Sequence, residues 1–126
     1  MAGISFITYK GVKILYQDFS SLHSDEEGLA LLKIGREIID QQPEKSVLAL
    51  FNIKNTNFTP TRTQALKEYA KANTPYIKMA VVCGVDGLKE IVYRSIIAFT
   101  GRKNLVICKT LEEAKDFLVD YHDKNP

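Results

Sequence analysis

The sequence has no tryptophan and, in 126 residues, only two cysteines and two histidines. The histidines and cysteines show no ligand spacing, so we expect no zinc site and no other metal or cofactor. Neither Cys83 nor Cys108 belongs to a CxxC pair, and each ends an apolar run. We interpret both as inert core thiols in a reducing cytoplasm, and a redox or ligand pair requires that their two strands be adjacent.

An excess of charge of one sign is also missing. The 17 basic and 15 acidic residues leave a net charge of +2, and no basic block is longer than Arg102-Lys103. Nucleic acid is therefore not expected as a partner. No apolar run reaches the length of a membrane span, which argues against membrane insertion, and the first ten residues do not resemble a signal peptide.

Four helix-start signals dominate what is present. They are Ser24-Asp25-Glu26-Glu27, Thr59-Pro60, Gly84-Val85-Asp86-Gly87 and Thr110-Leu111-Glu112-Glu113. Apolar runs without polar alternation precede the last three, which is typical of parallel strands covered on both faces. These runs are Ser46–Phe51, Ile77–Cys83 and Leu105–Cys108.

The first part of the chain predicts a hairpin. Ile4–Thr8 and Val12–Tyr16 flank a glycine turn, and a polar connection over Gln17–His23 follows. The chain therefore predicts a single α/β domain over residues 1–126, in the order β-β-α-β-α-β-α-β-α. We expect a mostly parallel sheet of about five strands, an antiparallel hairpin at its edge and helices packed on the sheet.

The first helix is predicted to bury an apolar stripe that contains a glycine. Gly35 costs about 1 kcal/mol of helix propensity relative to alanine, so we expect it to allow a close approach of the helix to the sheet. The stripe comprises Leu31, Ile34 and Ile38, with Leu32, Gly35 and Ile39 beside them.

The loop after the first buried strand is the first candidate ligand or phosphorylation site. It leads into a helix start, where free N–H groups favour anions. Ordinary turn and cap chemistry explains the same residue types. The candidate residues are Asn55, Thr56, Thr59, Thr61 and Thr63. A second candidate, Gly84–Gly87, lacks the full phosphate-binding glycine patterns, and Asp86 fits a cap.

The third helix carries a wide apolar arc. Its core face is predicted to hold Leu88, Ile91, Val92 and Phe99, and Tyr93, Ile96 and Ile97 extend the arc. Either another element of the chain covers this arc, or it contacts a protein partner or a second copy. For catalysis, Ser20, Ser21 and His23 lie close in sequence, but nothing indicates that they converge, and helix capping explains them.

Four stretches resemble the SpoIIAA-like family, which is related to STAS domains and similar in fold to CRAL-TRIO lipid-transfer domains. They are Ser46–Phe58, Ala72–Gly84, Phe99–Arg102 and Thr110–Leu118. STAS domains that act as anti-sigma-factor antagonists bind a partner kinase until a serine in an Asp-Ser-Ser-Gly motif is phosphorylated. The matching stretch here is Thr59-Pro60-Thr61-Arg62, in which only Thr61 keeps a hydroxyl near the modified position. Many SpoIIAA-like proteins have no assigned activity, so the resemblance implies a bacterial domain without one.

These observations favour a binding or regulatory domain over an enzyme. A protein partner or a homodimer is the leading expectation, engaged through the third helix or the Thr59–Thr63 region. The alternative is a small apolar ligand or lipid, which requires a cavity of a few hundred cubic ångströms beneath a movable helix.

Overall fold

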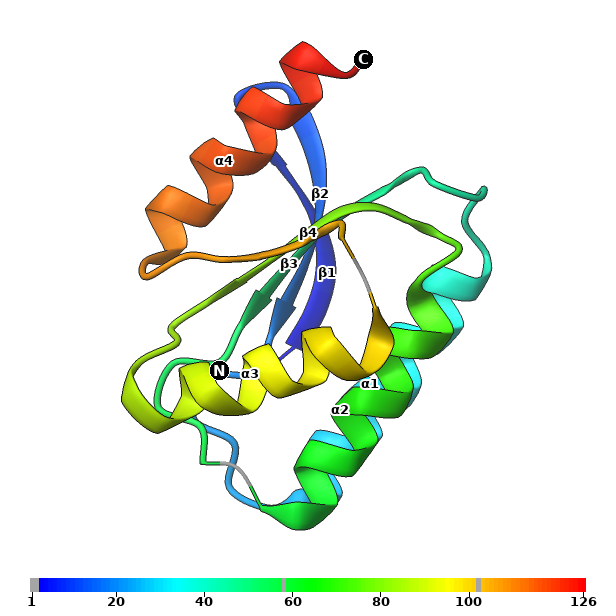
Figure 1. Ribbon diagram of the computed structural model, residues 1–126. Coiled ribbons are helices and arrows are strands. Elements are labelled where there is room, and N and C mark those ends of the chain that lie inside the picture. Colours follow the sequence, from blue (N-terminus) through cyan, green and yellow to red (C-terminus); the bar gives the residue numbers. More distant parts are fainter. Residues whose placement is uncertain (1–2, 58, 102) are drawn as a thin grey trace.

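The computed structural model describes residues 3–57, 59–101 and 103–126. The described chain forms one five-stranded sheet with helices on both faces (Figure 1). Its elements are β1 (Gly3–Tyr9), β2 (Val12–Asp18), α1 (Asp25–Asp40), β3 (Val47–Asn52), α2 (Pro60–Asn73), β4 (Ile77–Cys83), α3 (Gly87–Thr100), β5 (Leu105–Ile107) and α4 (Leu111–Lys124).

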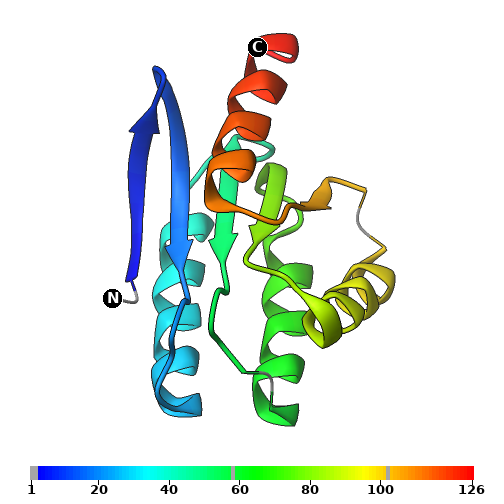
Figure 2. The same cartoon turned by 90° about the vertical axis from the view of Figure 1, so that its left-hand side faces the viewer.

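The strands lie in the sheet in sequence order, with β1 antiparallel to β2 and every later pair parallel. This confirms the predicted element order and mixed sheet. Successive right-handed crossovers that advance in one direction leave their helices on the same face. Accordingly α1, α2 and α3 cover one face, and α4, which follows the last strand, covers the other (Figures 1 and 2).

The central strands β3 and β4 are buried on both faces, as their apolar runs predict. The prediction holds only in part for β5 at the sheet edge: Leu105 and Ile107 pack against one core and Val106 against the other, but all three residues are only half-buried. The prediction was wrong for Gln17, which belongs to β2 and is buried rather than part of a polar connection. None of the helices in the described part of the chain has the length and apolar character of a membrane span.

Three of the four predicted helix starts are capped by a side chain. Ser24, Thr59 and Thr110 each accept a hydrogen bond from the backbone N–H three residues later, at 3.1 Å. Asp86 occupies the N-cap of α3 without such a bond. The end of α3 also follows the prediction, because Gly101 is left-handed with φ of 66°.

Gly35 allows α1 to lie close to both β1 and α2. A Cβ at this position would overlap the Tyr69 hydroxyl and lie 3.1 Å from Ile4 Cδ1. The predicted close approach is therefore confirmed. The predicted burial of Ile34 was wrong, since this side chain is 46% exposed. Arg36 faces α2, and Ile34, two residues and about 200° away, points to the opposite side of α1.

Candidate functional site

The candidate residues of the β3–α2 loop mostly serve the fold. Asn55 adopts a left-handed turn conformation with φ of 60°. Thr56 is buried, and its hydroxyl donates a hydrogen bond to the carbonyl of Phe19. It also accepts one from the N–H of Leu22 at 3.5 Å. Turn chemistry therefore accounts for both residues.

The start of α2 is tied to the start of α1 by a carboxylate. Asp25 accepts a hydrogen bond from the Thr59 hydroxyl at 3.0 Å and an ion-paired bond from Arg62 Nε at 2.7 Å. Arg62 also donates to the carbonyl of Asn57 at 2.8 Å. Sequence reasoning missed this link because Asp25 lies 37 residues from Arg62.

The five loop candidates do not converge on one site. Thr63 is half-buried and Thr61 is exposed on the first turn of α2, which contains no acidic residue. A phosphoryl group there would meet the positive end of the helix dipole. Phosphorylation of Thr61 stays a prediction.

The predicted interface on α3 is largely interior. Tyr93 is 3% exposed and Ile96 is 1% exposed, and both belong to the core formed with α2 and the sheet. Ile97 is half-buried. Burial raises the pKa of the Tyr93 hydroxyl well above its usual value. Coverage by the chain's own elements therefore accounts for Tyr93 and Ile96.

The predicted core face of α3 needs one correction. Ile91 is 66% exposed and does not belong to the core. The side chains of Leu88, Val92 and Phe99 lie outside the described residues.

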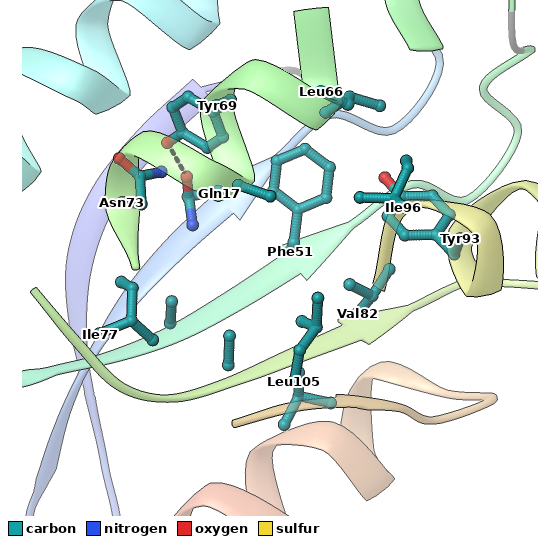
Figure 3. Close-up of a pocket in the computed structure, with 14 residues that line it drawn as sticks. Gln17, Phe51, Leu66, Tyr69, Asn73, Ile77, Val82, Tyr93, Ile96 and Leu105 are labelled. Atoms are coloured by element: carbon teal, nitrogen blue, oxygen red, sulfur yellow. Dashed lines mark hydrogen bonds between the residues drawn. The ribbon is translucent and has the colours of Figure 1, made fainter. Parts of the chain in front are cut away.

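A small cavity lies between the sheet, α2 and α3 (Figure 3). Its volume is about 60 Å³. One end is polar, where the buried Tyr69 hydroxyl donates to Gln17 Oε1 and Arg36 donates to Asn73 Oδ1 at 2.5 Å. Burial raises the pKa of Tyr69 strongly. Its lining residues include Gln17, Phe51, Leu66, Tyr69, Asn73, Ile77, Val82, Tyr93, Ile96 and Leu105.

The volume of this cavity limits what it can hold. A single water needs roughly 10–15 Å³, whereas drug-sized ligands occupy pockets of about 300–1,000 Å³. At about 60 Å³ the cavity has room for a few waters or a fragment of a few atoms. The amide nitrogen of Gln17 points into this space in Figure 3, which suits a hydrated cavity.

An open cleft of about 800 Å³ lies at the carboxyl ends of β3, β4 and β5. Here the chain leaves β4 toward one face of the sheet and β5 toward the other, and such switch points favour ligands in α/β proteins. Gly84, with φ of 81°, brings this turn close to the next loop, since a Cβ would lie 2.6 Å from the Lys54 nitrogen. The cleft is lined by the basic residues Lys54 and Lys109 and by the acidic residues Asp86 and Glu90, so it carries charges of both signs.

The two cysteines lie beside each other at this cleft, and Cys108 lines it. Val82 of β4 pairs with Ile107 of β5, and the N–H of Cys108 donates a hydrogen bond to the Val82 carbonyl at 2.8 Å. Cys83, the last residue of β4, and Cys108, the residue after β5, are therefore neighbours. Both are free thiols. Burial raises the pKa of Cys83 to about 12, with a smaller contribution from Cys108. The pKa of Cys108 is also raised by burial, so neither thiol is activated.

Two further expectations concern catalysis and metals. The Ser20 hydroxyl donates to Asp18 Oδ1 at 2.5 Å, and the His23 N–H donates to Glu27 at 3.0 Å, so Ser20 and His23 have separate local partners. Within residues 3–57, 59–101 and 103–126, no group of three or more His, Cys, Asp or Glu side chains is placed to hold a metal ion.

The outer edge of β1 is a feature that the sequence analysis did not single out. This seven-residue strand, Gly-Ile-Ser-Phe-Ile-Thr-Tyr, contains no charge and no proline. It pairs only with β2 among the described strands, and it lies along the left margin of the sheet in Figure 2. Phe6 is 37% exposed, and the Lys13 ammonium lies 4.2 Å from its ring centroid. The signal that could have found this edge is the absence of charge over the whole strand.

Comparison with known proteins adds no relative to this description. No family model matches the chain, and no curated protein matches it at a significant level. The resemblance to the SpoIIAA-like family therefore stays a prediction, and the geometry of the chain itself has to carry the functional argument.

Proposed function

We propose that the protein is a binding or regulatory domain that works by associating with a protein chain at the outer edge of β1. The observation that carries the proposal is the outer edge of the uncharged strand Gly3–Tyr9, which pairs only with β2 among the described strands. Backbone N–H and C=O groups along such an edge add a further strand from another chain, and the alternating side chains then supply specificity.

The interior favours this function over an enclosed ligand. The cavity beneath α2 and α3 has about one fifth of the volume at the lower end of the usual range for ligand pockets, roughly 300 Å³. The side of α1 next to β1 adds the exposed Ile34 to the accessible apolar surface. Partner binding therefore has an available surface that extends from the strand edge onto a helix.

A photo-crosslinking amino acid tests the proposal. Placed at position 6, it should form adducts with a protein chain in the cells that make the protein. The matched control carries the same group at Gln64, which is exposed on α2 and far in sequence from β1. Equal adduct yields at positions 6 and 64 would contradict the proposal.

A second candidate function is the binding of a small ligand in the open cleft. The specific observation is its location, at a switch point and with a volume of about 800 Å³. A Cβ at Gly87 would meet nothing within 4 Å, and asparagine tolerates the positive φ of 41° at this position better than most residues. Gly87→Asn should therefore narrow the cleft with little backbone strain. Saturation-transfer NMR with a library of small carboxylates and phosphates should detect binding to the unmodified chain and a loss in this variant. No binding to the unmodified chain would eliminate this candidate.

A further inference from the structure

We propose that the chain which completes the β1 edge is a second copy of this protein, paired antiparallel across a two-fold axis at Phe6. This inference rests on the proposed function and names its partner. The argument comes from the backbone geometry of the hairpin, the charge of the strand and the side of α1 beside it.

The hairpin determines which backbone groups of β1 are available. Lys10 and Gly11 both have positive φ, 48° and 80°, which is typical of a two-residue type I′ turn. Such a turn closes on a hydrogen-bonded pair, here Tyr9 and Val12. Bonding alternates along an antiparallel ladder, so the N–H and C=O groups of Ile4, Phe6 and Thr8 point away from β2.

These outward groups suit self-pairing in one register. With Phe6 opposite Phe6 of the second copy, Ile4 faces Thr8 of that copy and Thr8 faces its Ile4. Every outward N–H and C=O of the strand then has a partner. A register centred on Ser5 places Phe6 opposite Ile4 of the second copy and leaves Thr8 without a partner in the strand. A register centred on Ile7 places Phe6 opposite Thr8 and leaves Ile4 without a partner.

Charge also favours a second copy. Opposed like charges destabilise cross-strand pairs, and self-pairing would double every charge on the strand. The strand from Gly3 to Tyr9 has none, so no like charges face each other across the two paired strands. A closed two-fold contact also uses the same surface on both copies, which ends the association at a dimer.

The neighbouring helix extends the same contact. Because α1 packs against β1 at Gly35 and Ile4, its side away from α2 stands beside the open edge. This side carries the exposed Ile34 and the partly buried Ile38. A two-fold axis perpendicular to the sheet places α1 of both copies on the same face, where each brings apolar surface toward the other.

Sedimentation velocity with two charge variants tests the proposal. The unmodified chain should form dimers whose fraction rises with concentration. Phe6→Lys should be monomeric at the same concentrations, because it places two like charges at the axis and Lys13 of each copy adds to them. Phe6→Glu should also weaken the dimer, but less, because Lys13 partly offsets the glutamate charge. An equimolar mixture of the two variants should recover the dimer, since opposite charges then face each other.

The outcomes separate the partner from the general function. If the unmodified chain stays monomeric at every concentration, the proposal that the partner is a second copy is wrong. Crosslinked adducts with other proteins at position 6 would still support the proposed function. Dimers that persist in both single variants, or a mixture that stays monomeric, overturn the Phe6 register. If circular dichroism shows that a charge variant is unfolded, Thr8→Pro decides the matter. It removes an outward N–H, and the proposal expects a folded monomer.

Discussion

The two edges of the sheet differ in length, charge and exposure. The β5 edge has three residues, with Lys103 shortly before it and Lys109 shortly after it. The β1 edge has seven residues and no charge. Short strands and flanking lysines are the usual protection against edge pairing, so β5 is protected and β1 is open.

This difference shows where association should be sought. The hydrophobic arc of α3 predicted an interface from the sequence, yet two of its residues, Tyr93 and Ile96, are buried in the core. The β1 strand is less apolar, but only β2 pairs with it among the described strands, so the backbone groups along its other side are available to another chain. An interface is therefore indicated by unpaired backbone and missing charge more than by hydrophobicity.

The largest expected effect comes from proline scanning of β1. Ile7→Pro removes an N–H that faces β2, and we expect a loss of about 1–3 kcal/mol in the free energy of unfolding. Thr8→Pro removes an outward N–H and should change that free energy by less than about 1 kcal/mol while abolishing association. Urea unfolding and sedimentation of both variants measure this. Equal destabilisation would contradict the assignment of outward groups.

The support of the β1 edge by α1 gives the next effect. Gly35→Ala introduces a Cβ that overlaps the Tyr69 hydroxyl, and overpacking of this kind costs about 1–3 kcal/mol. Gly3→Ala is the control, because a Cβ there meets nothing within 4 Å. Tyr69→Phe alone should destabilise the fold because it removes the bond to the buried Gln17. It should cost less in the Gly35→Ala background, where it also relieves the overlap, and this smaller cost is the recovery that we expect. A lack of recovery in thermal unfolding would contradict the close approach.

The stability of the fold should depend on pH because the Cys83 thiol is buried and its pKa is raised. The pKa of Cys83 is about 12 in the folded protein, above its ordinary value of 9.0. Between these values the folded state binds more protons than the unfolded state, so stability should fall as pH rises, by up to about 1.4 kcal/mol per unit. Cys83→Ala should lessen this slope between about pH 9 and 10, below the usual tyrosine range. An unchanged slope in urea unfolding would contradict the burial of this thiol.

The smallest effect is expected at the β5 edge itself. Replacing Lys103 and Lys109 together by serine removes charge from surface positions, which changes stability by about 0.5 kcal/mol or less. Sedimentation should show the same association as in the unmodified chain, because three residues offer little edge. A new, larger species would mean that the lysines alone protect β5.

Local signals made most of the fold predictable from the sequence. Ser24, Thr59 and Thr110 cap their helices as expected, and the uninterrupted apolar runs identify β3 and β4. Gln17 was misplaced because its polarity predicts a connection, whereas Tyr69, 52 residues away, satisfies its amide inside the core. Burial of a polar group depends on such distant partners, which no local pattern reveals.

The candidate sites were less predictable for the same reason. The threonine-rich loop has the composition of a ligand site, yet Thr56 and Thr59 bond to Phe19 and Asp25 from other elements. Ile34 fits the helical period of a buried stripe, but α2 lies on the other side of α1 and leaves it exposed. The side of a helix that receives a neighbour depends on the order of strands in the sheet.

Amide hydrogen exchange of β1, read residue by residue against protein concentration, tests the account most directly. The N–H groups of Ile4, Phe6 and Thr8 should become protected as concentration rises, and Phe6→Lys should leave them unprotected throughout. Exchange of these three amides at an unprotected, concentration-independent rate, alongside protected amides in the rest of the sheet, would contradict the claim that β1 joins another chain.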